Sequence, residues 1–220
     1  MGEKINKKQT CFIMIRFIKG SKEFEYHLKN FKRLFSENEL RRNPFNDSFK
    51  CYLFFVSDCI WDEDTFNRII NFLKQRGDQK LYFYIFDQHA KELPSQTEEK
   101  NYVWEGNVVE ILILDINDSY TDYYEGCVGR AQEICYTFYF FATSDSLDWG
   151  LAVDELDEIG VVGFKEKNVK DLYLSSKTAV DDEIYYRSLE EMKSEYIESG
   201  YCPFKLFDDL QMAYSNERCQ

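Results

Sequence analysis

The chain has 220 residues, 44% of them hydrophobic and 17% aromatic, a composition that predicts a folded globular protein rather than a disordered one. It carries 40 acidic and 27 basic side chains, which gives a formal net charge of −13. A strongly negative protein repels nucleic-acid phosphates and attracts basic partners, so we expect no direct binding of DNA or RNA outside the basic N-terminal part.

No stretch of the sequence reaches the roughly 18 to 20 apolar residues that span a bilayer. The basic start, Met1 to Thr10, is not followed by the hydrophobic region of a signal peptide. Seven cysteines are present at irregular spacing without a CxxC pair, and this pattern predicts mostly buried thiols in a reducing compartment. The sequence therefore indicates a cytoplasmic protein that does not associate with a membrane.

Hydrophobic periodicity predicts strands and helices in alternation in the first half of the chain. The expected elements are a strand at Thr10–Ile18, a helix at Ser21–Ser36, a strand at Phe49–Val56, a helix between Asp62 and Gly77, and strands at Leu81–Phe86 and Val108–Ile116. The strand–helix–strand order from Phe49 to Phe86 has the length of a βαβ unit. The polar segment 87–106 is interpreted as a long surface loop or short helix, and it is the candidate internal boundary of the single domain 1–220.

The second half contains three strand-like runs joined by short acidic turns, which predicts an antiparallel meander. The expected elements are a turn at 117–126, strands at Ile134–Phe141, Trp149–Val153 and Ile159–Phe164, a charged connection at 165–177, and helices at Asp181–Glu198 and Pro203–Tyr214. Together these elements predict an α+β (or α/β) fold. Its single mixed, mainly antiparallel sheet has about seven strands and is accompanied by about four helices.

The sequence contains no strong catalytic signature. It lacks a nucleophile elbow, a Gly-rich phosphate loop and a paired set of metal ligands, so we expect a non-catalytic protein without cofactor or metal. The alternative is a metal-dependent hydrolase or nuclease that uses Asp87, His89 and Glu92, because His89 and Glu92 could supply two metal ligands.

Acidic residues are concentrated in one segment. Residues 105–160 hold 13 acidic side chains and one basic side chain, that of Arg130. The carboxylates that crowd the two meander turns are either solvated turn residues or an acidic docking face for a basic partner. The candidate partner-binding residues are Asp145, Asp148, Asp154, Glu155, Asp157 and Glu158.

The block SLDWGLAVDELDEIGVVGF at 146–164 resembles the closing strands of small bacterial immunity proteins of contact-dependent inhibition and other polymorphic toxin systems. In those proteins a Trp begins a strand of the form W-G-L/I, an acidic turn follows, and an I-x-V-V/I-G-F strand ends the sheet. The residues that carry the pattern here are Trp149, Gly150, Ile159, Val162, Gly163 and Phe164.

The resemblance implies a cytoplasmic immunity protein that binds and neutralises a cognate toxin. The acidic bias adds that this toxin is basic, as a nuclease would be, and that the carboxylates of the meander turns contact it. Two alternatives with the same carboxylates are an inhibitor that mimics DNA and an adaptor.

Overall fold

The computed structural model describes residues 16–36, 40–92, 102–133, 139–155, 157–176, 186–199 and 204–215, with the backbone alone for 87–92, 102–106, 127–133 and 204. At its centre lies one sheet of seven strands in the order β1-β4-β3-β5-β6-β7-β2, and every neighbouring pair is antiparallel. The strands are β1 (Arg16–Ile18), β2 (Cys51–Val56), β3 (Lys80–Glu92), β4 (Tyr102–Asp115), β5 (Tyr139–Ser144), β6 (Trp149–Asp154) and β7 (Ile159–Phe164). The α+β fold with one mainly antiparallel sheet is thus confirmed.

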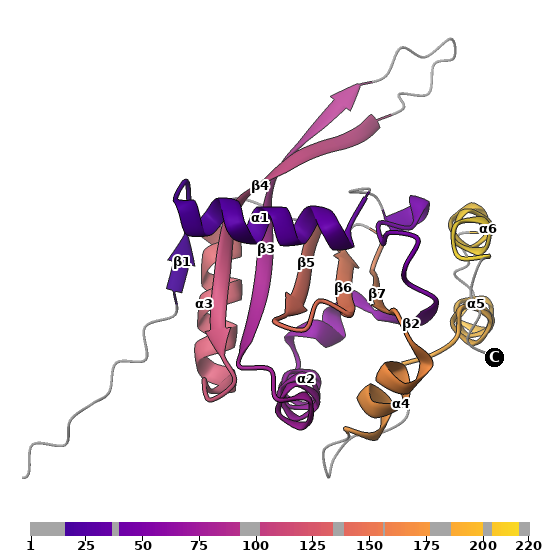
Figure 1. Cartoon of the computed structure of the whole chain (residues 1–220). Helices are drawn as coiled ribbons and strands as arrows, with labels where there is room; N and C mark the ends of the chain where they lie inside the picture. Colours follow the sequence, from indigo (N-terminus) through magenta and orange to yellow (C-terminus); the bar gives the residue numbers. More distant parts are fainter. Residues whose placement is uncertain are drawn as a thin grey trace, which may run out of the picture.

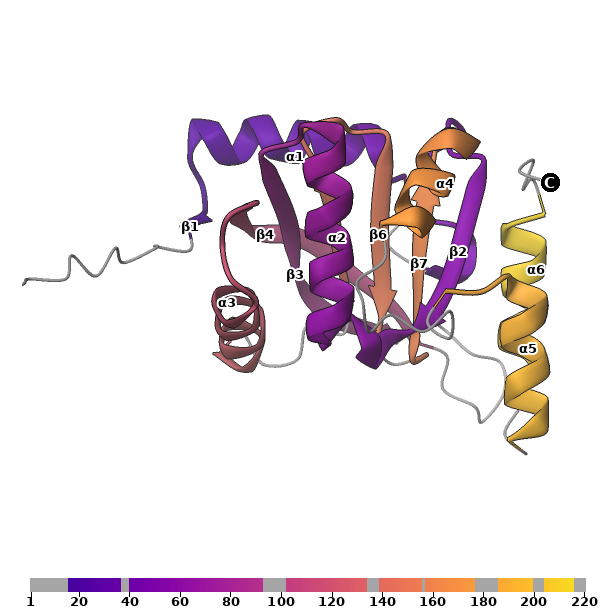
Figure 2. The same ribbon diagram turned by 90° about the horizontal axis from the view of Figure 1, so that it is seen from below.

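Helices cover both faces of the sheet (Figures 1 and 2). The described helices are α1 (Lys22–Leu34), α2 (Glu63–Arg76), α3 (Tyr120–Glu133), α4 (Lys167–Ser175), α5 (Leu189–Glu198) and α6 (Phe204–Ala213), with 3-10 turns η1 (Leu40–Arg42) and η2 (Ser57–Trp61). Helices α1, α5 and α6 pack in one hydrophobic core, and α2, α3 and α4 pack in the other. None of the described helices is long and apolar enough to cross a membrane.

The central strands are buried on both faces, so they carry apolar residues at nearly every position. In β6, for example, Leu151 and Val153 lie in the core under α2, whereas Ala152 between them lies in the core under α1. This three-layer arrangement explains why the strands read as continuous apolar runs rather than as strict alternation.

Two predicted helices begin or end where the sequence indicates. The side chain of Ser21 accepts a hydrogen bond from the Phe24 amide and caps α1. Gly77, with φ 78°, ends α2 in the left-handed conformation. Asp62 occupies the N-cap position of α2, but its side chain makes no capping hydrogen bond.

Two further helices were not predicted. Helix α3 lies partly in the segment interpreted as an acidic turn, and α4 lies in the segment interpreted as a charged connection. Both lack a strong apolar stripe: α3 contains two glycines, and α4 has nine residues of which two, Val169 and Tyr173, are buried. We therefore infer that packing against α2, rather than a local sequence pattern, stabilises α3 and α4 as helices.

Strands β2 and β3 do not form a paired βαβ unit. Three strands, β5, β6 and β7, lie between them in the sheet. Because four antiparallel pairings separate β2 from β3, the two strands run in the same direction, and α2 crosses the sheet between them. The meander of the second half is inserted into this gap, which the strand–helix–strand pattern could not reveal.

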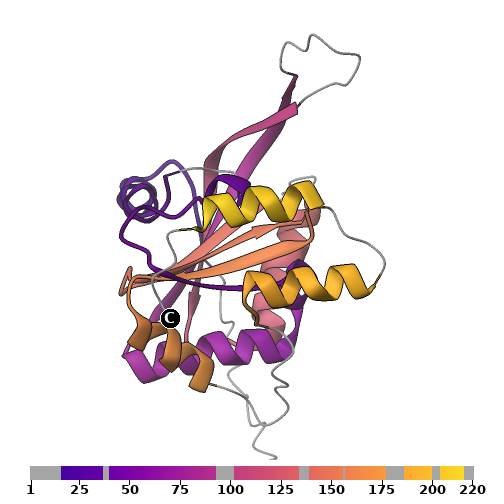
Figure 3. The same cartoon turned by 90° about the vertical axis from the view of Figure 1, so that its right-hand side faces the viewer.

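The interpretation of 87–106 as a loop or short helix is wrong for the described part of that segment. Strand β3 continues to Glu92, and β4 begins at Tyr102. Strand β5 pairs β3 only up to Ile85, and a register shift in the β3–β4 pairing follows at Ile85/Phe86. Beyond that shift the two strands pair with each other, without a third strand among the described residues, and project from the body of the molecule (Figures 1 and 3).

Three glycines let aromatic rings approach the meander closely. Gly150 and Gly163 face each other across β6 and β7, and a Cβ at either position would lie 2.8 Å from a ring carbon of Phe35 or Phe45. Gly160 lies opposite Phe55 of β2, whose ring covers it. The glycines of the I-x-V-V-G-F strand are therefore required by packing.

Candidate functional site

The two acidic turns of the meander lie at opposite ends of β6. One turn joins β5 to β6 and the other joins β6 to β7. A strand of six residues separates them by about 17 Å at the usual rise per residue. The six carboxylates predicted as one docking face therefore belong to two separate places, which differ in their surroundings.

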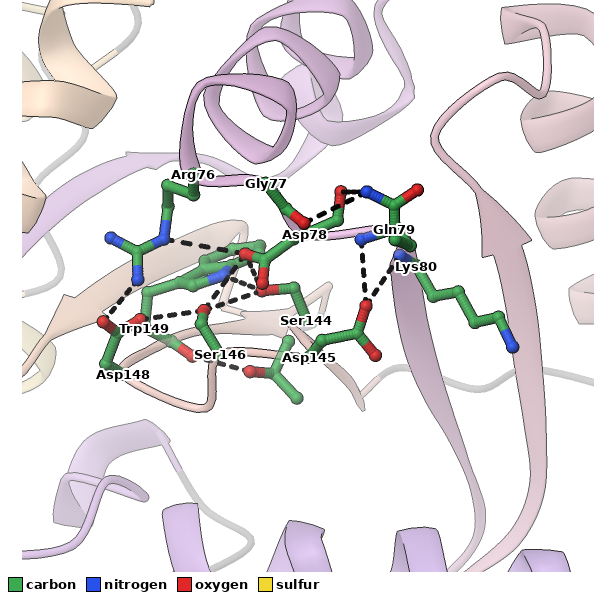
Figure 4. A network of polar contacts seen from close by, with 11 residues as sticks. Arg76, Gly77, Asp78, Gln79, Lys80, Ser144, Asp145, Ser146, Asp148 and Trp149 are labelled. Carbon is green, nitrogen blue, oxygen red and sulfur yellow. Dashed lines mark hydrogen bonds and ion pairs between the residues drawn. The ribbon is translucent and has the colours of Figure 1, made fainter.

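The carboxylates of the β5–β6 turn are bound to the connection between α2 and β3 (Figure 4). Asp145 accepts hydrogen bonds from the backbone amides of Gln79 and Lys80, at 2.9 and 3.0 Å, and from the hydroxyl of Tyr82 at 2.7 Å. Asp148 forms an ion pair with Arg76 at 2.5 Å. Both carboxylates thus hold the turn in place, and their charges are partly satisfied within the chain.

A buried chain of hydrogen bonds continues inward from this turn. The indole Nε1 of Trp149 donates to Ser144 Oγ at 2.7 Å, and that hydroxyl donates to Asp78 Oδ2, also at 2.7 Å. Asp78 is 6% exposed and Trp149 is fully buried. Trp149 is therefore a core residue, and the aromatic residue of the immunity-protein pattern does not reach the surface.

At the other end of β6, two of the predicted residues are also engaged. Asp154 is fully buried and accepts hydrogen bonds from the Tyr139 hydroxyl and the Asp157 amide. Asp157 binds the guanidinium of Arg41, with Nε at 2.6 Å, and this hydrogen bond raises the pKa of Arg41. Asp154 is thus inaccessible to a partner, which corrects its place in the predicted docking face.

Glu155 and Glu158 have different surroundings, because they contact η2, the 3-10 turn that precedes α2. The Ser57 amide donates to the carbonyl of Glu158 at 3.0 Å, and the indole Nε1 of Trp61 donates to Glu155 at 3.2 Å. We call the carboxylates gathered here the acidic end; they are Asp58, Asp62, Glu63, Glu155 and Glu158. None of the five forms an ion pair with any residue that the structure describes.

Like charges in the acidic end repel one another. Burial raises the pKa of Glu155, the hydrogen bonds from Trp61 and Ser57 lower it in part, and the carboxylates of Asp58 and Glu158 raise it. Burial also raises the pKa of Asp62, together with the charges of Asp64 and Asp58. Holding these groups ionised at neutral pH costs folding free energy. Hydrogen bonds from Trp61 and Ser57 hold Glu155 in place, but no described cation balances the charge of the cluster.

Aromatic side chains border the acidic end. Trp61 is partly buried, and its carbonyl accepts a hydrogen bond of 2.6 Å from the hydroxyl of Tyr120. Tyr124 lies against Tyr120, with ring centroids 5.8 Å apart, and is 44% exposed. Aromatic rings beside charged groups are characteristic of protein-binding surfaces, where rings supply contact area and charges supply selectivity.

Neither of the two cysteines whose side chains the structure describes supplies a reactive thiol to this site. Cys59 is free, and burial, followed by the charges of Asp62 and Asp58, raises its pKa to about 11. A thiol that stays protonated at neutral pH is a poor nucleophile. Cys51 is disulfide-bonded and is therefore an exception to the expected pattern of mostly free thiols.

The alternative site of Asp87, His89 and Glu92 lies on the projecting part of β3. Positions 87 and 89 share one face of the strand by its two-residue period, and position 92 falls on the other. The strand therefore does not bring the three positions together. Elsewhere in the described part of the chain, no group of three or more His, Cys, Asp or Glu side chains could hold a metal ion.

Sequence reasoning missed the three residues of the acidic end that precede or begin α2. Asp58, Asp62 and Glu63 lie within six residues of one another, a local concentration of charge that a scan for acidic clusters would have found. Of these, Asp58 lies close enough to raise the pKa of Glu155, and this approach of two residues 97 positions apart depends on the β2–β7 pairing. No local pattern encodes that pairing.

Replacing Glu155 by glutamine is expected to stabilise the protein at pH 7 by about 0.5 kcal/mol, the order of a relieved like-charge repulsion. Because the fold raises the pKa of Glu155, the ionised carboxylate opposes folding at pH values above 4.5, the ordinary pKa of glutamate. The gain should therefore disappear as the pH falls below that value. Urea denaturation at several pH values measures this gain in the free energy of unfolding. Glu198→Gln, at an exposed position of α5, is the control. An equal gain in the control would contradict the interpretation.

The acidic end combines carboxylates with neighbouring aromatic side chains, a composition that occurs in protein-binding surfaces. Glu155 accepts a hydrogen bond from the indole of Trp61, and burial keeps the neighbouring Cys59 thiol protonated. No family model, curated protein or solved structure matches the chain.

Proposed function

We propose that this chain is a non-catalytic cytoplasmic immunity protein that binds and neutralises a basic protein toxin through the acidic end. The observation that carries the proposal is a cluster of five carboxylates without ion-pair partners among the described residues, beside partly buried Trp61 and exposed Tyr124. The repulsion within the cluster would be relieved by a partner that brings positive charge.

The chemistry of the surface favours a nucleic-acid-processing toxin as the partner. Such an enzyme carries Lys and Arg along the groove that binds phosphates. The carboxylates of the acidic end would pair with those cations and accelerate association, while Trp61 and Tyr124 would provide the desolvated contact that slows dissociation. Occupying the groove would block the substrate without any chemistry by this chain.

The resemblance at 146–164 supports the class but not the contact residues. Its apolar positions and Trp149 lie in the two cores, so the pattern describes how the meander packs. The contact residues are proposed instead from Glu155, Glu158 and the residues of η2 and α2 that meet them.

The proposal is tested by co-expressing the chain with the toxin domain encoded beside its gene, and by measuring their affinity by calorimetry. Wild type should restore growth. Asp58→Lys combined with Glu158→Lys should weaken binding by about tenfold or more and reduce its dependence on salt, since both reversals place like charges against the partner. Both residues are exposed, so the fold should persist.

The matched control is Asp171→Lys combined with Glu198→Lys, which makes the same change of charge at exposed positions of α4 and α5. Equal loss of binding in the control would show that total charge matters rather than the acidic end. Absence of binding by wild type would overturn the proposal. Asp145 and Asp157 are unsuitable for this test, because their reversal would break contacts that hold the fold.

A further inference from the structure

A histidine is buried where α1 crosses the sheet. His27 is 6% exposed, and its ring lies 4.4 Å from the ring of Tyr82 on β3 and 5.1 Å from the ring of Tyr26. Its Nδ1 atom is buried and has no hydrogen-bond partner among the described residues. Protonation would turn this nitrogen into a buried N–H donor without an acceptor among the described residues and would place a charge on a buried ring, and both changes are unfavourable.

The charged groups around His27 come from four elements and largely offset one another. Glu23 of α1 attracts a proton to the ring, but it forms an ion pair with Arg16 of β1. Lys80 of β3 opposes protonation, whereas Asp145 of the β5–β6 turn favours it. Asp145 already accepts hydrogen bonds from two backbone amides and from Tyr82. Burial is the dominant effect and lowers the pKa of His27 below 6.5.

We infer that His27 is an acid-sensitive latch, whose protonation releases the first half of α1 from the sheet while the opposite layer of helices stays folded. Neutral His27 packs against Tyr82 of β3 and so keeps α1 packed on the sheet. Since the folded state disfavours the protonated ring, the stability that His27 contributes is present above pH 6.5, the ordinary pKa of histidine, and is lost as the pH falls below it.

Release of α1 would affect one face of the sheet, because α1 packs in the core on that face and not in the core on the other. Phe24, His27 and Phe31 face the sheet from α1, and they cover a core that does not include α2. Helix α2 packs on the other face and does not depend on the histidine. The latch would therefore uncover aromatic surface on one side of the protein in mildly acidic surroundings.

Hydrogen exchange at about pH 7.5 and about pH 5.5, corrected for the intrinsic rate, tests the inference. In wild type, the corrected exchange rates of the α1 amides should be about tenfold higher at the lower pH than at the higher pH. This factor is the order expected from an unsatisfied buried donor. The amides of α2 should not change. The proton signals of the His27 ring in NMR spectra should titrate below 6.5.

Two variants and one control make the result decisive. His27→Phe keeps a ring against Tyr82 and His27→Gln keeps a polar group, and neither can titrate, so both should remove the pH response of α1. The chain has one other histidine, and His89→Gln should behave as wild type. Persistence of the response in both His27 variants, equal acceleration in α2, or unchanged exchange in wild-type α1 would each overturn the latch.

Discussion

Replacing Gly160 by alanine should destabilise the protein by about 2 to 3 kcal/mol, in the upper part of the range of about 1 to 3 kcal/mol for overpacked cores. A Cβ at this position would lie 2.1 Å from Cζ of Phe55 and 2.5 Å from both Cε atoms, which is far inside contact distance. The ring cannot easily turn aside, because Phe55 is 1% exposed and lies beside Tyr186, with ring centroids 5.6 Å apart. Urea denaturation compared with wild type measures the effect.

A double-mutant cycle with Phe55→Leu tests the cause. Leucine lacks the ring atoms that would clash, so the cost of Gly160→Ala should be much smaller in that background. Strictly additive effects would show that the ring is not the obstacle, and that the glycine is needed for another reason. The cycle thus separates close packing from backbone preference at this position, whose φ is not in the left-handed range.

Truncating Trp149 to alanine should cost about 3 to 5 kcal/mol, as for other large buried aromatic residues. The side chain is fully buried, contacts Phe72 at 5.5 Å between ring centroids, and donates its N–H to Ser144. Trp149→Phe should cost less, because it retains most of the packing and loses the hydrogen bond to the Ser144–Asp78 pair. Thermal or urea denaturation measures both variants.

The same variants distinguish a core role from a contact role. If Trp149 supports the fold alone, the folded fraction of Trp149→Phe should bind the toxin domain with the affinity of wild type. Weaker binding at full folding would show that the residue acts on the interface. A loss of less than about 1 kcal/mol in Trp149→Ala would contradict its place in the core.

The elements predicted best are those whose local signals agree with their packing. Strands β6 and β7 and helices α1 and α2 combine long apolar runs or stripes with clear ends, such as Ser21 and Gly77. Helices α3 and α4 and the projecting parts of β3 and β4 lack such signals. Their sequences are polar or glycine-containing, and tertiary contacts or cross-strand pairing stabilise them instead.

The candidate site could be predicted only in part, because the sequence shows where the charges are but not which residues neutralise them. In the sequence, Asp148 and Asp157 cannot be told apart from Glu155 and Glu158, because all four are acidic residues of the meander turns. Yet Asp148 pairs with Arg76, 72 residues away, and Asp157 pairs with Arg41, 116 residues away. These pairings follow from the topology of the sheet. The distinction between structural and available carboxylates therefore required the fold.

The place of β2 at the edge of the sheet has a consequence for biosynthesis. Among the described strands its one partner is β7, and the pairing joins Val56 to Ile159 and Cys51 to Phe164, while an isolated bridge links Phe54 to Arg187. During translation at roughly 5 to 20 residues per second, the apolar strand leaves the ribosome about 5 to 20 seconds before β7 is made. For that interval it has to be shielded by α2 or by a chaperone. The nascent chain is therefore most exposed to aggregation before its last third is synthesised.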